Sequence, residues 1–414
     1  MNLKVESISY EWEMRNFEFS SHFRLQNPQQ PGSLIQYTRR GRENEEEEQP
    51  RAAVDDQREK PRCEWDFNLS AVISSSAAGC ALGSDAIGVV EFDHSNTFFA
   101  TGGIARKIRI YNAQKLLLPR EKADGNAAFL DHAAACEYYM CTPAKLSSLK
   151  WKPGSGSGVI GSGDYDGVVM EYDLEKRVPV FERDEHGGRR VWSMDYSNWN
   201  PTLGGSGSDD GTMQIWDTRC DVGKTMASVK PDRYGCSPVC SVEFNPFGGH
   251  LVAVGCADRK IYGYDARRMV DPVFILDGHR KAVTYTRFLD QQRIVSSSID
   301  GCLKMWDAEN QHLIRTYEGH VNSRRFVGLS VWRTAGLFSC GSENNHVYVY
   351  DMRWGEPIWV GEFEQAATAA QPLCEPGFVS GVCWRETGGE RCTLVAGGSD
   401  GVLRVFEGER RPCS

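Results

Sequence analysis

One pattern constrains the fold of this chain of 414 residues more than any other. A strand-like run ends in an aromatic residue followed by aspartate, asparagine or glutamate, and most copies are separated by about 40–50 residues. A unit that recurs at this interval is a small sheet, which buries its apolar faces by stacking against its neighbours. The seven copies are RIYN at 109–112, MEYD at 170–173, QIWD at 214–217, YGYD at 262–265, KMWD at 304–307, YVYD at 348–351 and RVFE at 404–407.

A complete unit, residues 282–307, shows how each repeat is built. An alternating strand and a turn are followed by a strand of small residues, an acidic-Gly turn and a third strand. These features resemble the WD-repeat family over nearly all of residues 65–407. The resemblance implies an all-β fold, a seven-bladed WD-repeat β-propeller whose radially stacked sheets leave only short edges. The family's Gly-His pair or its variant precedes the first strand at Gly278-His279, Gly319-His320 and Glu185-His186.

The chain divides into two parts of different composition. Residues 1–62 include RRGRENEEEEQPRAAVDDQREKPR, which holds almost nothing to bury, so we expect a disordered acidic N-terminal extension. This extension is interpreted as a plain tail or as a segment that folds over a basic surface. Residues 63–410 form the predicted propeller. Because the last blade lacks an outer strand after RVFE, residues 65–72 are predicted to pair with it as a latch strand that closes the ring.

Composition and charge argue against several classes of function. The net charge of −9 argues against nucleic acid or membrane partners, and the absence of any run of about 18 apolar residues argues against a transmembrane helix. The N-terminus lacks the apolar segment of a secretory signal. The 14 cysteines show no Cys-x-x-Cys or zinc-finger spacing, CSPVC at 236–240 being the nearest approach. We therefore expect reduced thiols of the cytosol or nucleus and no bound metal.

No enzyme site is predicted, and no cofactor. DVGKT at 221–225 lacks the first glycine of a phosphate-binding loop, and GSGDYDG lacks the spacing of a calcium loop. A Ser/His/Asp constellation is suggested by one set of residues, but similar sets recur in several repeats, whereas an active site is built once. We therefore expect these residues to brace the blades. The set comprises His279, Ser298, Asp300 and Trp306.

Basic residues are predicted to gather on one face of the propeller. Loops that lead into the innermost strand lie on the same face as turns between the second and third strands. Aromatic residues fall among them at Tyr165, Trp192 and Phe326, a combination that suits a short acidic peptide with an apolar anchor. The alternatives are scattered surface charge and nucleic acid binding, which the net charge disfavours. The basic residues are Arg106, Lys107, Lys145, Arg189, Arg190, Arg259, Lys260, Arg280, Lys281, Arg324 and Arg325.

Several stretches resemble a narrower group of WD-repeat proteins. FFATGGIARKIRIYN, GSGDYDGVV, EHGGRRVWSMDYS, GCADRKIYGYDARR, GHRKAVTYTRFL and GHVNSRRFVGLSV are similar to the propeller of the constitutively photomorphogenic ubiquitin ligase of plants and its suppressor-of-phytochrome partners. The chain lacks their RING and coiled-coil segments, and as a stand-alone propeller it resembles the plant repressors of UV-B photomorphogenesis. The resemblance implies a groove that binds acidic Val-Pro peptides. That groove falls on Lys145, Tyr165, Arg190, Trp192, Lys281 and Phe326, with Arg259 in place of a groove histidine.

The resemblance also implies a function, repression of UV-B light signalling in the nucleus and cytoplasm. Such repressors bind the UV-B photoreceptor and promote its return from active monomer to inactive dimer. Further partners implied are proteins that carry acidic Val-Pro peptides and the photomorphogenic ligase itself.

A second function class is a substrate receptor of a cullin–RING ubiquitin ligase. WD-repeat proteins with Trp/Tyr-Asp-x-Arg after a third strand often dock on the adaptor of such ligases. The arginine is the informative residue, because the aromatic-Asp pair packs and caps the strand in any such protein. A general scaffold with unrelated partners is a third class. The matching residues are Trp216, Asp217 and Arg219 in WDTR, Arg267 in YDAR and Arg353 in YDMR.

Overall fold

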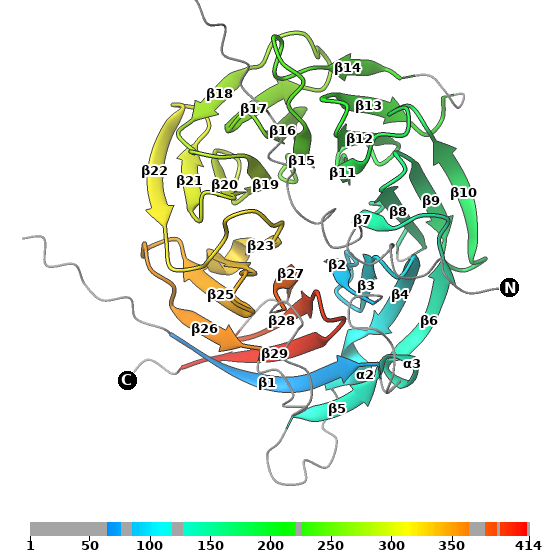
Figure 1. Cartoon of the computed structure of the whole chain (residues 1–414), viewed down its shortest axis with the longest axis vertical. Coiled ribbons are helices and arrows are strands. Elements are labelled where there is room, and N and C mark those ends of the chain that lie inside the picture. The colour runs from blue at the N-terminus through cyan, green and yellow to red at the C-terminus, as the bar shows by residue number, and fades with distance from the viewer. Residues whose placement is uncertain are drawn as a thin grey trace, which may run out of the picture. The chain divides into compact units, whose positions relative to one another are not determined.

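The structure, a computed structural model, describes residues 64–75, 85–117, 127–156, 158–220, 225–363, 377–386 and 390–411. It contains seven sheets arranged radially around a central axis, which confirms the predicted all-β, seven-bladed propeller (Figure 1). The expected N-terminal extension, 1–62, and most of the DVGKT segment lie outside the described residues. None of the described helices has the length and apolar run that crossing a membrane requires.

Six blades are antiparallel four-stranded sheets. Blade 1 contains β2 (Ile87–Phe92), β3 (Phe98–Gly103), β4 (Lys107–Asn112) and β6 (Cys136–Cys141). Blade 2 contains β7 (Leu146–Trp151), β8 (Val159–Asp164), β9 (Val169–Asp173) and β10 (Val178–Arg183). Blade 3 contains β11 (Val191–Tyr196), β12 (Leu203–Ser208), β13 (Met213–Asp217) and β14 (Ala227–Val229). Blade 4 contains β15 (Val239–Phe244), β16 (Leu251–Cys256), β17 (Lys260–Asp265) and β18 (Phe274–Asp277). Blade 5 contains β19 (Val283–Phe288), β20 (Arg293–Ser298), β21 (Leu303–Asp307) and β22 (His312–Tyr317). Blade 6 contains β23 (Leu329–Trp332), the short helix η1 (Arg333–Ala335), β24 (Leu337–Cys340), β25 (His346–Asp351) and β26 (Trp359–Glu362).

Apolar side chains fill the spaces between neighbouring blades. Ile215 of β13 shares a buried cluster with Val242 of β15 and Val254 of β16, so blades 3 and 4 have a common core. Complete burial of an aliphatic side chain of this size contributes about 1.5–3 kcal/mol. The outermost strands are more exposed, as in β22, which begins with three exposed residues. The second and third strands therefore supply most of the core, and the fourth strands form the rim.

A hydrogen-bonded brace joins the strands of blade 5. His279 Nδ1 lies 3.0 Å from the Asp300 carboxylate, and its Nε2 lies 2.7 Å from the Ser296 hydroxyl. The same hydroxyl accepts a hydrogen bond from Trp306 Nε1 at 2.8 Å. Each polar atom of this buried set is therefore engaged by another member of the blade, which is the arrangement of a structural support.

Ser298 takes part in this brace through the turn and not through the imidazole, because its hydroxyl accepts a hydrogen bond from the N–H of Asp300 at 3.1 Å. Ser298 ends β20, where its hydroxyl donates to the carbonyl oxygen of Lys281, so the hydroxyl within reach of the imidazole is that of Ser296. In blade 3, His186 contacts the hydroxyl of Ser206 at 2.7 Å in the same way. The recurrence predicted from the Gly-His variant is thus present in the structure.

The seventh blade closes the ring with strands from distant parts of the sequence. β27 (Val379–Arg385), β28 (Arg391–Gly398) and β29 (Leu403–Arg410) are joined by β1 (Trp65–Ser74). β1 pairs antiparallel with β29, from Trp65 opposite Arg410 to Ile73 opposite Leu403. The closing strand starts at the predicted residue and extends beyond residue 72 to Ser74.

The closing strand covers the edge of β29, and a further strand lies beyond its last four residues. β5 (Ala128–Asp131) pairs in parallel with residues 71–74 beyond it and makes this sheet five-stranded (Figure 1). β5 belongs to a connection between β4 and β6 that also contains α2 (Ala113–Leu117) and α3 (His132–Ala135). Blade 1 therefore holds the closing strand of blade 7 from outside.

His132 anchors this connection to both blades. Its Nε2 lies 2.8 Å from the carbonyl oxygen of Gly401 in the turn between β28 and β29, and its Nδ1 lies 2.7 Å from the Tyr111 hydroxyl of β4. Because a carbonyl only accepts, Nε2 carries the proton and Nδ1 accepts from Tyr111. The imidazole is 4% exposed, and burial lowers its pKa, so it is held neutral.

Candidate functional site

Backbone hydrogen bonds set the turns of one face beside the beginnings of the inner strands. The N–H of Tyr165, in the turn between β8 and β9, donates to the carbonyl oxygen of Lys145 at 2.9 Å. In blade 3 the N–H of Asp209, between β12 and β13, donates to the carbonyl oxygen of Arg190 at 2.9 Å. The repeated bond fixes a turn residue and a residue that leads into an inner strand as neighbours on the predicted face.

Arg190 lies between two aromatic rings on this face. Its guanidinium carbon is 4.1 Å from the ring centroid of Tyr165 and 4.5 Å from that of Trp192. Trp192 in turn stacks on Phe326, with centroids 4.2 Å apart and ring planes inclined by 1°. Trp192 belongs to blade 3, whereas Phe326 precedes the inner strand of blade 6, so the contact crosses the axis of the propeller. Four predicted residues from three separate stretches of the sequence thus form one continuous surface.

Tyr285 of β19 extends this surface and is absent from the sequence prediction. Its ring meets that of Phe326 edge-on, with centroids 5.9 Å apart and planes inclined by 76°. Burial raises the pKa of Tyr285 to about 12, which keeps the phenol neutral. The signal was the alternation in VTYTRF, which puts Tyr285 and Arg287 on one side of an otherwise buried strand. We call Tyr165, Arg190, Trp192, Phe326 and Tyr285 the aromatic–arginine stack.

Exposed cations lie on the same face as the aromatic–arginine stack. Lys281 Nζ donates to the carbonyl oxygen of Ser323 at 3.2 Å, and Arg259 Nε donates to that of Asp258 at 3.3 Å. Both side chains are exposed, so their charges face solvent. We call these two residues the basic rim. Of the other cations predicted for this face, Lys145 is half-buried, and the exposed ones include Arg106, Arg189, Arg280 and Arg324.

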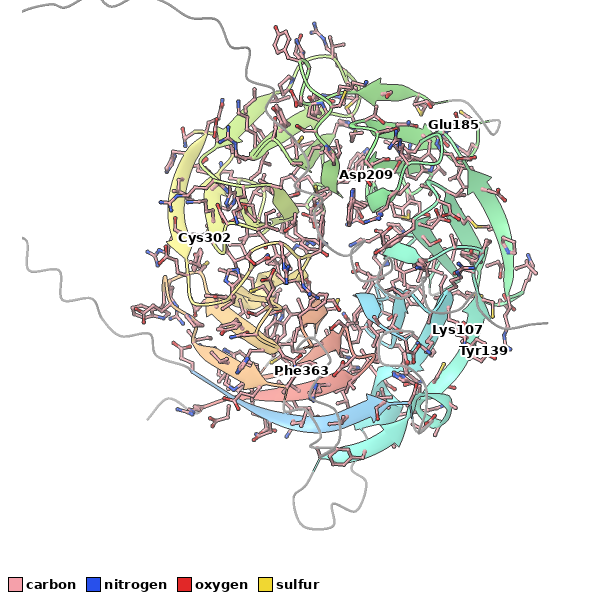
Figure 2. The ribbon with its side chains drawn as sticks, viewed as in Figure 1. Lys107, Tyr139, Glu185, Asp209, Cys302 and Phe363 are labelled. Carbon is pink, nitrogen blue, oxygen red and sulfur yellow. The ribbon has the colours of Figure 1, made fainter. Side chains whose placement is uncertain are left out.

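The prediction that all the basic residues crowd this face was wrong for Lys107 and Lys260, and the structure buries Arg325 over the ring of Phe378. Lys107 lies over the ring of Tyr139 in the outer strand β6, 5.1 Å from its centroid (Figure 2). Lys260 lies 3.6 Å from Asp277 of β18, and Arg325 is only 6% exposed. Lys107 and Lys260 begin third strands, and pairing with the fourth strands directs their side chains toward the rim of the propeller.

The aromatic–arginine stack borders the central channel. A cavity of about 420 Å³ is lined by the inner strands of all seven blades and includes Trp192 and Tyr285. Toward its other end, Arg333 pairs with Glu243 at 3.2 Å and with Glu386 at 2.8 Å. The two carboxylates more than offset this single guanidinium, so the positive charge offered to a ligand concentrates at the basic rim.

The arginines of the Trp/Tyr-Asp-x-Arg motifs lie on the opposite face, in turns between third and fourth strands. Each guanidinium donates to the aspartate two residues before it, and this bond lowers the pKa of Asp217 to about 2. Trp216 is 1% exposed and packs in the core, as expected for an architectural residue. The N–O distance is 2.6 Å in each of the pairs Arg219–Asp217, Arg267–Asp265 and Arg353–Asp351.

Arg353 has a further partner that the other two arginines lack among their described contacts. The guanidinium of Arg353 lies 3.1 Å from the carboxylate of Glu64, the residue just before the closing strand. Glu64 also pairs with Arg410 at 3.0 Å. The side chains of Arg219 and Arg267 are 68% and 66% exposed. Arg219 and Arg267 are therefore the members of the motif set whose guanidinium groups are most accessible.

Known proteins resemble this chain along most of its length. Arabidopsis thaliana WD repeat-containing protein RUP2 is 60% identical over 331 residues, which cover 80% of this chain and 89% of that protein. WD repeat-containing protein RUP1 of the same plant is 56% identical over 352 residues, covering 84% and 86%. The E3 ubiquitin-protein ligase COP1 of Arabidopsis thaliana is 33% identical over 77% of this chain, but this region is only 44% of the ligase.

A family pattern agrees with the fold. Residues 192–352 match the propeller family described as Nucleolar protein 10-like, N-terminal domain. This match runs from β11 of blade 3 to the end of β25 in blade 6, whereas RUP1 and RUP2 are matched over most of their length. The chain belongs to the family of WD repeat-containing proteins that includes RUP1 and RUP2.

Proposed function

We propose that this chain is a non-enzymatic interaction propeller that represses UV-B light signalling by binding the UV-B photoreceptor and promoting its return to the inactive dimer. The observation that carries the proposal is the aromatic–arginine stack beside the basic rim, at the positions where similar propellers bind acidic Val-Pro peptides. The high sequence identity to RUP1 and RUP2 also supports this proposal. The histidine sets of blades 3 and 5 are braces, which favours binding over catalysis.

Binding alone is sufficient to accelerate dimer recovery. A propeller that holds a photoreceptor monomer through an acidic segment restricts its orientation and lowers the entropic cost of pairing with a second monomer. In this scheme the flat rings of Trp192 and Phe326 hold an apolar anchor, and Lys281 and Arg259 attract the acidic residues. The photomorphogenic ligase and other proteins with acidic Val-Pro segments are proposed as further partners of this chain.

The proposal is tested by mixing purified protein with UV-B-activated photoreceptor and timing dimer recovery. Trp192→Ala and Lys281→Glu are each expected to weaken photoreceptor binding at least about tenfold and to slow recovery, because they remove an anchor surface and reverse a rim charge. Lys176→Glu is the control, since Lys176 is 73% exposed in a turn of the opposite face. Unchanged affinity of the Trp192 and Lys281 variants would reject the groove.

The geometry of the motif arginines favours a second candidate function, docking on the adaptor of a cullin–RING ligase. Arg219 and Arg267 are held alike by their aspartates and lie in adjacent blades. Arg219→Ala combined with Arg267→Ala should abolish co-precipitation of the adaptor without altering the thermal unfolding midpoint. Lys176→Ala on the same face is the matched control. Undiminished co-precipitation by the double variant would exclude this route.

A location in the nucleus and cytoplasm is proposed from the cysteines and the family. All the cysteines of the described residues are free thiols, Cys236 and Cys240 among them, as in proteins of reducing compartments. No group of three His, Cys, Asp or Glu side chains within the described ranges is arranged to hold a metal ion. Imaging a fluorescent fusion in plant cells tests the location.

A further inference from the structure

Asp209 contacts both central members of the aromatic–arginine stack. Figure 2 shows it on the inner part of blade 3, near the axis of the propeller. Its backbone N–H donates to the carbonyl oxygen of Arg190 at 2.9 Å, and its carboxylate accepts a hydrogen bond from Trp192 Nε1. Asp209 therefore fixes both the loop segment that leads into β11 and the orientation of the indole ring.

The charge of Asp209 offsets that of Arg190. Burial raises the pKa of the Asp209 carboxyl above its ordinary value, and the Trp192 hydrogen bond and the nearby Arg190 and Arg189 oppose this rise, which favours the carboxylate. A carboxylate next to the guanidinium makes the centre of the stack close to neutral. The facing surfaces of the stacked Trp192 and Phe326 rings cover one another, so the stack offers a ligand the remaining exposed parts of these rings as an apolar surface rather than a cationic one.

The basic rim has no such compensation among its described contacts. The side-chain hydrogen bonds of Lys281 and Arg259 go to backbone carbonyl oxygens, which leave the positive charges in place. The face is thus divided into a neutral aromatic part and a cationic part. A peptide that fits it places an apolar residue on the first and acidic residues on the second.

We propose that Asp209 is a positioning and specificity-determining residue of this groove. By holding Trp192 and neutralising Arg190, it makes the aromatic–arginine stack accept an apolar side chain and reject an acidic one. Acidic residues of the same peptide are directed to Lys281 and Arg259. This inference rests on the proposed peptide-binding function of the face and names the feature of the ligand that the stack selects.

Two substitutions separate the positioning role from the charge. Asp209→Asn keeps the shape and an oxygen that accepts from Trp192 Nε1, but removes the negative charge. Asp209→Ala removes both. The probes are a fluorescent peptide of acidic residues followed by Val-Pro, and the same peptide with its valine replaced by glutamate. Asp166→Asn is the control, because Asp166 is an exposed carboxylate next to Tyr165 on the same face.

The measured quantity is the ratio of the dissociation constants of the two peptides. The wild-type protein and the Asp166 variant should prefer the valine peptide strongly, and Asp209→Asn should reduce this preference about tenfold while still binding the valine peptide well. Asp209→Ala should weaken binding of the valine peptide about tenfold, because the indole loses its partner. A purely structural role would change both dissociation constants by one factor and leave the ratio unchanged.

Two results would overturn the inference. An unchanged ratio in Asp209→Asn, with the valine peptide still bound, would refute the specificity role and leave the proposed function intact. Wild-type protein that binds neither peptide would reject the proposed function and this inference with it. Circular dichroism of each variant confirms that the propeller is folded, and the Asn variant provides the test if the Ala variant is not.

Discussion

At the scale of single residues, the turns between second and third strands show where the chain accepts backbone strain. Most of these turns use glycine in the left-handed region, where other residues cost about 1 kcal/mol or more. Arg259 occupies this position in blade 4, although a glycine would relieve the strain. Such strain is retained where a side chain has a role. The positions are Gly167, Gly211, Gly301 and Gly401 in four blades, and Arg106 (φ 54°), Arg259 (φ 81°) and Asn345 (φ 62°) in the other three.

Replacing Arg259 by glycine should therefore separate stability from binding. Arg259→Gly is expected to raise the free energy of unfolding by about 1 kcal/mol, because the strain is released. The same change should weaken binding of an acidic peptide several-fold, since one charge of the basic rim is lost. Chemical denaturation and peptide titration measure the two effects. Binding that stays at the wild-type level would remove Arg259 from the groove.

The candidate site was only partly predictable from the sequence. Local pattern placed Trp192 and Phe326 on one face, because both sit at the beginnings of inner strands. Their parallel contact depends on the width of the channel, which is set by the closed ring and not by any local run of residues. Nothing in GSGSDDG indicates that the carboxylate of Asp209 faces Trp192, so this residue could not be assigned to the site from the sequence.

At the scale of elements, the connection that contains α2, β5 and α3 was missed entirely. Its strand has four residues and pairs in parallel with β1, a strand that precedes it by more than a whole hairpin in the chain. Short strands with such distant partners leave no periodic signal of their own. The repeats themselves were predictable because each carries the same strand ending.

His132 should contribute measurably to the stability of this closure. His132→Ala is expected to lower the free energy of unfolding by about 1–3 kcal/mol, because it leaves the Tyr111 hydroxyl and the Gly401 carbonyl buried without their partner. Combining it with Tyr111→Phe should cost less than the sum of the single changes, since both remove one hydrogen bond. Urea denaturation of the four proteins measures this coupling, and strict additivity would contradict it.

At the scale of the whole molecule, buried histidines make folding sensitive to acid. Burial lowers the pKa of His320 to about 4 in the folded protein, against an ordinary value of 6.5. The stability that this neutral imidazole supports is fully present above pH 6.5 and is lost as the pH falls toward 4, because the unfolded chain binds the proton first. Asp195 acts in the opposite sense, since burial raises its pKa to about 6.

Replacing His320 should therefore flatten the pH dependence of unfolding. In the wild-type protein this residue alone accounts for a loss of about 2 kcal/mol between pH 7 and pH 5. His320→Gln is expected to lose correspondingly less over that interval, whatever its stability at neutral pH. Denaturation curves of both proteins at the two pH values give the comparison, which cancels the contribution of Asp195. Equal slopes would show that His320 is protonated in the folded state.

The double pairing of the closing strand bears on how copies of this protein behave toward one another. A terminal strand that lies on an open edge is easily exchanged between two molecules, which links rings into swapped dimers. Here β1 is bound on one side by β29 and on the other by β5, so exchange requires both ladders to break at once. The outer edge of this sheet is instead formed by β5, which has four residues and is a poor template for further pairing. The ring is thereby protected against exchanging strands with other copies even at high local concentration.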